Sequence, residues 1–337
     1  MPTPPPGAPS SAASFEEAVA LSLPAPSPAP ARGITRLHDG VLSEVYGFEH
    51  AGEELVLKLY RFDLERAVHG DPDPRFRAAS RFMAIPPFFA SSAERIARLG
   101  PGVETGTAFP EVLGEGRLAD GTPFTLMRRL AGEPWTPART ADPSARRAVS
   151  EQLGALLAGM HARAGEPGGV ARTGAEWVED YESLLHLAAD HLPAPAVPSE
   201  EGRWRLHGAL QRIVQRLANL HLGPTVIAHG DCGPENLLFA ADGRLCGLVD
   251  FQLSCPAPAA MDLRWTPELD GEAFLAAYGW PPARRAEVPW LARFFQMLWE
   301  GLILVVFHRY AGHSVPAAMW ASAGRRYREL VRGLERE

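Results

Sequence analysis

Hydrophobic and polar residues alternate along the first part of the chain, which is the pattern of β-strands with one buried face. This period of two occurs at residues 33–37, 44–48, 54–60, 110–118 and 123–130. It places Val56, Lys58 and Tyr60 on one face of the third strand. The Asp120-Gly121 pair between the last two strands has the composition of a hairpin turn. We therefore expect an antiparallel sheet over residues 33–130.

From Asp142 onward, apolar residues recur at every third or fourth position, which predicts amphipathic helices. Asp142 is the expected N-cap of the first of these helices, and Pro143 fits its first turn. His161, beside the apolar stripe of this helix, is expected to be a hydrogen-bonded structural histidine. With a short helix after Ser91, the expected helices lie at residues 142–160, 177–188, 206–217, 274–278, 289–310 and 316–332. The order of elements predicts an α+β protein.

The first 32 residues follow neither pattern. Nine of the 32 prolines lie within the first thirty positions, mixed with alanine and serine. Such a segment buries too little apolar surface to offset the entropy of ordering it, so we expect residues 1–32 to be a disordered tail. Within it, Phe15 to Leu23 could form a transient helix. The segment lacks the basic start and the continuous apolar core of a secretion signal.

The composition of the 337 residues, with 46% hydrophobic and 22% charged, indicates a globular protein large enough for two lobes. A formal charge of -7 argues against a nucleic-acid partner. Cys232, Cys246 and Cys255 form no C-x2-C metal pair and are expected to be reduced thiols without chemistry. The longest apolar run, residues 301–307, is too short to span a bilayer. We expect a cytoplasmic protein without a membrane partner.

Three polar side chains lie among the apolar runs of residues 226–252, which read VIAHGDCGPENLLFAADGRLCGLVDFQ. Asp231 lies in a loop whose Gly and Pro residues favour a fixed conformation. Asn236 and Asp250 lie at opposite ends of a predicted hairpin that turns at Asp242-Gly243. Because the two strands of a hairpin pair antiparallel, we expect Asn236 and Asp250 to lie close together.

The sequence HGDCGPENLL, followed by VDF, closely resembles the catalytic loop and metal-binding segment of aminoglycoside phosphotransferases and their choline-kinase-like relatives. Its His-x-Asp-x4-Asn spacing is that of the kinase catalytic loop. The resemblance implies a bilobal protein-kinase-like fold, with an antiparallel-sheet N-lobe at residues 33–130 and a mainly helical C-lobe at residues 131–337. It also implies ATP-dependent transfer of the γ-phosphate to a hydroxyl of a small molecule.

The resemblance assigns roles to the three polar residues. Asp231 is the expected base for the acceptor hydroxyl, and Asn236 and Asp250 are the expected ligands of Mg2+, which prefers hard oxygen ligands. His229 is expected to shape the loop through hydrogen bonds, without a proton-transfer role. Asp262, in an Asp-Leu pair after the metal-binding segment, is expected to be architectural.

Lys58 lies in the middle of the strand EELVLKLYR, where alternation alone also allows an exposed lysine on an edge strand. The resemblance instead makes it the residue that binds the α- and β-phosphates and pairs with a helix glutamate. Glu94 is the expected partner, although its Ser-x-x-Glu motif also fits a helix cap. Glu65 is the alternative, because residues 69–89 look like an insertion that departs from the family pattern.

Two further segments are expected to bind the nucleotide. A glycine-containing loop, residues 38–43, lies between the first two strands and ends at Ser43, and the resemblance makes it the loop over the phosphates. By itself, one glycine in a hairpin is also typical of a simple turn. The resemblance places the interlobe hinge, whose backbone holds adenine, at Met127, Arg128 and Leu130.

A pseudokinase and a metallohydrolase are the alternatives to a small-molecule kinase. A pseudokinase that binds nucleotide without turnover has the same motifs, and Gln252 replaces the Gly of the kinase Asp-Phe-Gly segment. A metallohydrolase with His229, Asp231 and Cys232 as ligands lacks further ligands at recognisable spacings. Neither a Walker A motif nor a GxGxxG motif after a strand occurs.

The acceptor and the donor nucleotide stay open. Acidic clusters at residues 176–182 and 268–272 would favour a polycationic acceptor such as an aminoglycoside if either lines the acceptor cleft. Acidic residues are also typical of helix N-termini and solvent-exposed faces. An amino alcohol, a sugar or another small hydroxylated molecule is equally compatible with the sequence, and GTP is an alternative to ATP as the donor.

Overall fold

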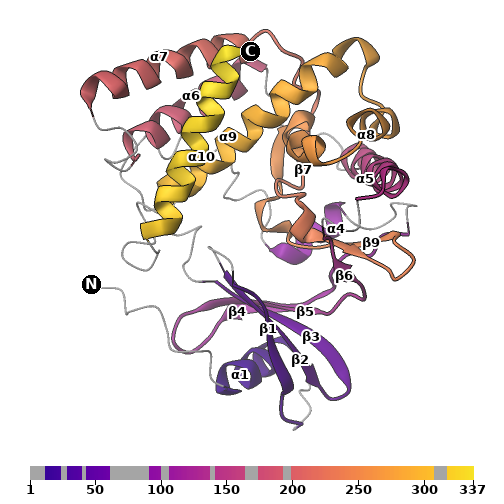
Figure 1. Ribbon diagram of the computed structural model, residues 1–337. Coiled ribbons are helices and arrows are strands. Elements are labelled where there is room, and N and C mark those ends of the chain that lie inside the picture. Colours follow the sequence, from indigo (N-terminus) through magenta and orange to yellow (C-terminus); the bar gives the residue numbers. More distant parts are fainter. Residues whose placement is uncertain are drawn as a thin grey trace.

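The computed structural model describes residues 12–23, 29–39, 43–60, 91–99, 106–136, 141–163, 174–192, 199–306 and 317–337. A twisted antiparallel sheet and a larger helical body form two lobes, which are connected near β6 (Glu133–Pro134) (Figure 1). This arrangement confirms the predicted α+β bilobal fold. We call the sheet part the N-lobe and the helical part the C-lobe.

The N-lobe sheet has the strand order β1-β2-β3-β5-β4, and each neighbouring pair is antiparallel. Its strands are β1 (Arg32–Asp39), β2 (Ser43–His50), β3 (Glu53–Tyr60), β4 (Val112–Arg117) and β5 (Pro123–Arg128). In β3, Leu55, Leu57 and Leu59 are buried in the N-lobe core. Because side chains alternate across a strand, Lys58 is on the other face, as the period of two predicts.

The helix α1 (Ala12–Ser22) covers the core face of this sheet. Phe15 is 1% exposed and makes edge-to-face contacts with Tyr46 and Phe48, with ring centroids 5.3 and 5.4 Å away. Ala18 and Val19 are buried beside it. The prediction of a disordered tail is therefore wrong for residues 12–22. A short apolar stripe is sufficient here because the sheet offers a preformed apolar face.

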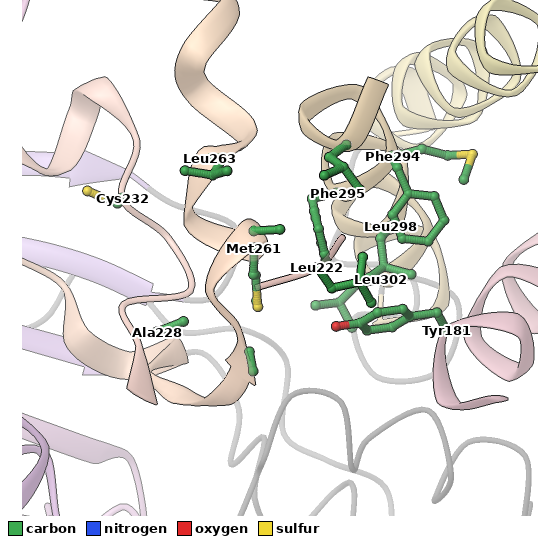
Figure 2. Packing of buried hydrophobic residues seen from close by; sticks show 14 of the residues in the cluster. Tyr181, Leu222, Ala228, Cys232, Met261, Leu263, Phe294, Phe295, Leu298 and Leu302 are labelled. Atoms are coloured by element: carbon green, nitrogen blue, oxygen red, sulfur yellow. The ribbon is translucent and has the colours of Figure 1, made fainter. Parts of the chain in front are cut away.

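The C-lobe is built from helices around one large core. These helices are α5 (Pro143–Arg163), α6 (Gly174–Asp190), α7 (Glu200–Leu217), α8 (Gly271–Tyr278), α9 (Val288–Val306) and α10 (Ala317–Arg336). Figure 2 shows Phe295, Leu298 and Leu302 of α9 in the packing around Leu222 and Met261. Residues 282–305 are apolar enough to cross a membrane, but 72% of the most apolar window is buried inside the protein. This stretch is therefore accounted for as a core segment.

Short elements between these helices carry the loops of interest. The strand β7 (Thr225–Ala228) pairs with β10 (Cys255–Pro258), and β6 pairs with β8 (Leu237–Phe239), which pairs with β9 (Leu245–Leu248). Three 3-10 helices follow or separate them: Pro234–Asn236, Phe251–Leu253 and Ala259–Glu268. The N-lobe meets this region through α4 (Ser92–Leu99), which contacts the second of the three 3-10 helices.

Candidate active site

The loop after β7 is held in place by Asp262. One carboxylate oxygen of Asp262 accepts hydrogen bonds from the backbone N–H of His229, at 2.7 Å, and from His161 Nε2, at 3.1 Å. The other accepts the backbone N–H of Gly230 at 2.9 Å. Gly230 has φ +81°, and a Cβ there would lie 2.2 Å from the carbonyl oxygen of Leu253. The loop conformation thus requires both the acidic anchor and the glycine.

Electrostatics supports this anchoring role. Burial alone would raise the pKa of Asp262, but the hydrogen bond and charge of His161 and the hydrogen bond from the Gly230 N–H hold it below its usual range. Burial lowers the pKa of His229, whose Nε2–H donates to the Val249 carbonyl at 3.0 Å while its Nδ1 accepts the Asp231 N–H at 3.2 Å. His229 is therefore a neutral loop-shaping residue, as expected, and His161 is structural.

Asp231 presents its carboxylate from this loop, with 16% of its side chain exposed. Asn236 Nδ2 donates to the Asp231 carbonyl at 2.7 Å and to Asp231 Oδ2 at 3.2 Å. Arg264 Nη2 donates to Asp231 Oδ1. The carboxylate is thus fixed on both oxygens while part of it faces solvent.

The predicted hairpin brings Asn236 and Asp250 to the same end. Leu237 pairs with Leu248, and the Val249 N–H donates to the Asn236 carbonyl at 3.0 Å. Asp250 has φ 65° and ψ 66°, a left-handed conformation that is uncommon outside glycine but tolerated by aspartate. Backbone strain of this kind is concentrated at functional sites. The turn directs the Asp250 carboxylate toward the N-lobe.

Lys58 meets Asp250 across the two lobes. Its ammonium lies 2.7 and 2.8 Å from the two carboxylate oxygens of Asp250, and the Lys58 side chain is 6% exposed. Burial lowers the pKa of Lys58, but Asp250, Tyr60 and Asp231 together raise it above its usual value. Burial likewise raises the pKa of Asp250, and the charge and hydrogen bond of Lys58 bring it below its usual value. This contact joins the N-lobe sheet to the C-lobe segment that follows β9.

The expected pairing of Lys58 with Glu94 is not formed. The Glu94 N–H donates to Ser91 Oγ at 3.0 Å, and its carboxylate lies 3.4 Å from Arg98. Its first-turn position thus serves the helix, as the capping alternative proposed. Instead, Arg95 of α4 donates from Nη1 to the carbonyl of Gln252 at 2.9 Å and links the helix to the segment after Asp250. Glu65 and the insertion at 69–89 lie outside the described residues.

Of the expected nucleotide-binding residues, Ser43 and Met127 lie on the face of the sheet that carries Lys58. Ser43 starts β2, is buried and faces Tyr60 in the register, whereas Gly40 lies outside the described residues. Met127 pairs with Val56 in the sheet. The Arg128 side chain is engaged with Glu53 and Glu111 at 2.6 and 2.7 Å. The Arg128 backbone N–H also has a partner, because it donates to the Glu111 carbonyl at 2.9 Å.

Leu130 places the end of the hinge beside the hairpin that carries Asn236 and Asp250. A Cβ on Gly247 would lie 3.3 Å from Leu130 Cδ1 and 3.1 Å from Leu238. Cys246 of the same strand has its sulfur 3.5 Å from the Ala131 carbonyl. Glycine at position 247 thus permits the close approach of the hinge to β9.

The donor set fits a magnesium ion. Asn236 offers an amide oxygen and Asp250 a carboxylate that is 33% exposed, and both are hard oxygen ligands. Two protein ligands are sufficient for Mg2+, because the ion usually keeps several waters and binds substrate phosphates. Within the described ranges, no group of three or more His, Cys, Asp or Glu side chains could hold a metal. Burial raises the pKa of Cys232 well above its usual value, which argues against the thiolate that the metallohydrolase alternative needs.

Three acidic residues of the two clusters have local structural partners. Asp270 caps α8 by accepting the Ala273 N–H at 3.1 Å, and Glu272 lies 2.9 Å from Arg285. Glu182 lies 3.6 Å from His186, on the same helix. These contacts support the helix-terminus interpretation and do not connect either cluster to Asp231.

The sequence analysis missed Arg264, the ion-pair partner of Asp231. It is 5% exposed and lies two residues after Asp262, in a segment without helical or strand periodicity. The available signal was the charge itself, because an arginine next to Met-Asp-Leu in an apolar segment needs an anionic partner once it is buried.

Comparisons with known proteins agree with this geometry. The model of the phosphotransferase enzyme family matches residues 33–298. No curated protein sequence matches the chain.

Several solved structures share the fold. An aminoglycoside phosphotransferase with GDP and kanamycin has a TM-score of 0.63 and 16% identity, over 95% of this chain and 98% of that one. A type I macrolide 2'-phosphotransferase has a TM-score of 0.58 and 16% identity, over 94% and 98%. An ADP-bound aminoglycoside phosphotransferase has a TM-score of 0.55 and 14% identity, over 90% and 94%.

Proposed function

This chain belongs to the phosphotransferase enzyme family, and from that premise we propose that it transfers the γ-phosphate of ATP to a hydroxyl of a small molecule. The observation that carries the proposal is the contact of Lys58 with Asp250, which joins the N-lobe sheet to the segment after β9. The charge of Asp231 also acts on Lys58. A cation for the phosphates, oxygen ligands for Mg2+ and a carboxylate for the acceptor are the groups that phosphoryl transfer requires.

The chain's use of basic residues supports the role of Lys58. Of the 33 Lys and Arg residues, Lys58 is the only lysine. Lysine differs from arginine in being a compact point charge with three donors. Such a charge suits the phosphate oxygens that are expected beside this strand. All the remaining basic residues are arginines, so the chain has lysine only where a nucleotide phosphate is expected.

In the proposed reaction, Asp231 accepts the proton of the acceptor hydroxyl and orients its oxygen toward the γ-phosphorus. Lys58 binds the α- and β-phosphates, and Asn236 and Asp250 hold Mg2+. Mg2+ bound there supplies neutralisation of the phosphate charge. Ser43 and the backbone of Met127, Arg128 and Leu130 bind the nucleotide, and His229 and Asp262 keep the loop in shape.

The acceptor belongs to the class of hydroxylated, antibiotic-like small molecules. Proteins of the same fold include an aminoglycoside phosphotransferase with bound kanamycin and a macrolide 2'-phosphotransferase. Nucleotides of both kinds, GDP and ADP, are bound in these relatives, so GTP is a second candidate donor. We place the protein in the cytoplasm, where nucleotide triphosphates are available.

The single lysine makes a direct test possible. Selective [15N]lysine labelling gives one ammonium signal from Lys58, and addition of Mg-ATP should shift it because the ammonium leaves Asp250 for the phosphates. Calorimetry with Mg-ATP, Mg-GTP and each nucleotide with EDTA then defines the donor and the metal requirement. An unchanged lysine signal without binding heat contradicts the proposal.

An acceptor screen completes this test. Kanamycin, hygromycin B, a macrolide, amino alcohols and sugars are incubated with Mg-ATP, and phosphorylated product is detected by mass spectrometry. Product with any acceptor establishes the reaction class. Nucleotide binding without product from any acceptor or from water instead indicates the catalytically silent pseudokinase.

A further inference from the structure

Arg264 is in direct contact with Asp231, the candidate base. Its side chain is 4% exposed, and its Nη1 donates to the Gly230 carbonyl at 3.0 Å while its Nη2 donates to Asp231 Oδ1. One guanidinium plane therefore contacts both the backbone and the carboxylate of the same loop. Such a two-point contact suits the planar fork of arginine, whose donors are fixed in direction.

Two tryptophans hold this guanidinium in place. The Arg264 guanidinium carbon lies 4.6 Å from the ring centroid of Trp299, on α9, and 5.2 Å from that of Trp265. Contacts of a cation with an indole face are attractive and fix its orientation. Packing against Trp299 of α9 thus fixes the orientation of Arg264. Through its two hydrogen bonds, Arg264 in turn holds the loop that carries Asp231.

Stability alone is a poor explanation for this arginine. Within the described part of the chain, Arg264 Nε is buried and has no hydrogen-bond partner. A buried charge with an unsatisfied donor carries a desolvation penalty, and replacing a buried ion pair by apolar residues of similar volume is often neutral or stabilising. Violations of this kind are expected at functional sites.

The two contacts on Asp231 define its carboxylate plane. Arg264 occupies one lone pair of Oδ1, and Asn236 Nδ2 contacts Oδ2 at 3.2 Å. A carboxylate offers about four lone-pair sites, so these two contacts leave acceptor capacity for a substrate hydroxyl. Without Arg264, rotation about the Cβ–Cγ bond would be restrained only by the longer contact to Asn236.

We infer that Arg264 is the positioning residue of Asp231, and that it fixes the carboxylate in the orientation that receives the acceptor hydroxyl. The inference rests on the proposed function for its catalytic consequence. The positional part depends only on the contacts of Arg264 itself. The two parts can therefore be tested separately.

The positional part is tested with a crystal structure of Arg264→Met. Methionine keeps much of the side-chain length and removes the charge and both donors. We expect the Asp231 carboxylate to rotate or to occupy more than one orientation, while the Asp262 hydrogen bonds to His229 and Gly230 remain. An Asp231 carboxylate that is unchanged in this variant overturns the inference, whatever the protein's reaction is.

The catalytic part is tested by phosphate release from Mg-ATP with water as the acceptor, and with any acceptor that responds. We expect kcat of Arg264→Met and Arg264→Lys to fall roughly 100-fold, the scale of a misplacement of about 1 Å, with the nucleotide KM within about threefold of wild type. Arg326→Met is the control for the loss of an arginine ion pair, because Arg326 donates to both carboxylate oxygens of Glu300, at 2.6 and 2.9 Å. Its kcat should remain near that of wild type.

Chemical rescue distinguishes positioning from a general loss of packing. Millimolar guanidinium chloride should raise the kcat of Arg264→Ala at least tenfold, because the ion can replace the missing guanidinium against the two indoles. Urea, which has the same planar shape without charge, and sodium chloride should not. Equal effects of urea and guanidinium, or a wild-type kcat for Arg264→Met, overturn the inference. Absence of turnover and of nucleotide binding in the wild-type protein counts against the proposed function, and the crystal structure then decides the inference.

Discussion

The catalytic loop of the C-lobe and the Lys58 strand of the N-lobe are held by different kinds of contact. Asp262 fixes the loop with buried hydrogen bonds to His229, Gly230 and His161. Lys58 reaches the same site through one ion pair with Asp250, whose side chain is 33% exposed. The C-lobe half of the site is thus preorganised by its own fold. The N-lobe half depends on an ion pair that, in the proposed function, a nucleotide exchanges.

The largest effect on stability is expected for Asp262→Ala. Three donors lose their acceptor in the interior, and each unsatisfied buried donor costs about 1–3 kcal/mol, so the free energy of unfolding should fall by roughly 4 kcal/mol or more. Urea denaturation measures this change. Asp270→Ala is the matched control. It removes the N-cap of α8 and should lower the free energy of unfolding by only about 1 kcal/mol. Equal costs would show that Asp262 is not a special anchor.

The next largest effect tests the N-lobe side of the comparison. Phe15→Ala removes the aromatic side chain that α1 inserts between Tyr46 and Phe48, and should lower the free energy of unfolding by about 3–4 kcal/mol. Leu21→Ala on the same helix is the control, because Leu21 is 59% exposed and should change stability by less than about 0.5 kcal/mol. Equal values for both variants would mean that α1 does not stabilise the sheet.

Lys58→Met should have a smaller effect on stability than on binding. Solvent screens the partly exposed Asp250, so the expected loss is only about 1 kcal/mol. Affinity for Mg-ATP should fall at least about tenfold, because the phosphates lose their cation. Lys58→Arg is the matched variant, and calorimetry compares the three proteins. A Lys58→Arg protein that binds like wild type would remove the argument from the chain's single lysine.

The free energy of unfolding should depend on the Lys58–Asp250 ion pair at both low and high pH. The folded pKa of Asp250 is below its usual value, so its contribution is present above the unfolded value of about 4 and is lost as pH falls through the folded pKa. The folded pKa of Lys58 is above its usual value, so its contribution is present below about 10.4 and is lost as pH rises through the folded pKa. Urea denaturation of wild type and Lys58→Met across pH measures both. Parallel curves for the two proteins would contradict the ion pair.

The smallest effect is expected for Glu94→Gln. Its carboxylate pairs with Arg98 on the helix surface, and such i,i+4 pairs contribute about 0.3–0.5 kcal/mol. Nucleotide affinity should stay within about twofold of wild type. A tenfold loss would restore the pairing of Glu94 with Lys58 that the family resemblance implied.

Local spacing made much of the site predictable. Asp231, Asn236 and Asp250 lie within one loop and hairpin, and the pairing of Leu237 with Leu248 follows from the apolar runs on both sides of Asp242-Gly243. The strand of Lys58 follows from its alternation. Each of these features depends on neighbours in sequence, which is the information that periodicity and turn composition contain.

Contacts between distant segments were not predictable in this way. The Lys58 ion pair spans 192 residues, and Arg264 reaches Asp231 from a segment without periodicity. The helix α1 was missed because its proline- and alanine-rich surroundings indicate disorder, although Phe15, Ala18 and Val19 have helical spacing. Its stability comes from the apolar face of the sheet, a tertiary contact that composition does not report.

Asp231→Asn tests the central claim most directly. The variant keeps the size of the side chain while it removes the charge and one of the two acceptor oxygens. It is compared with wild type for transfer of labelled γ-phosphate from Mg-ATP to the acceptor panel and to water. If Asp231 is the base, kcat for phosphate transfer should fall at least about 1,000-fold, while the affinity for Mg-ATP should stay within about threefold of wild type. An Asp231→Asn protein that transfers phosphate at the wild-type rate would contradict it.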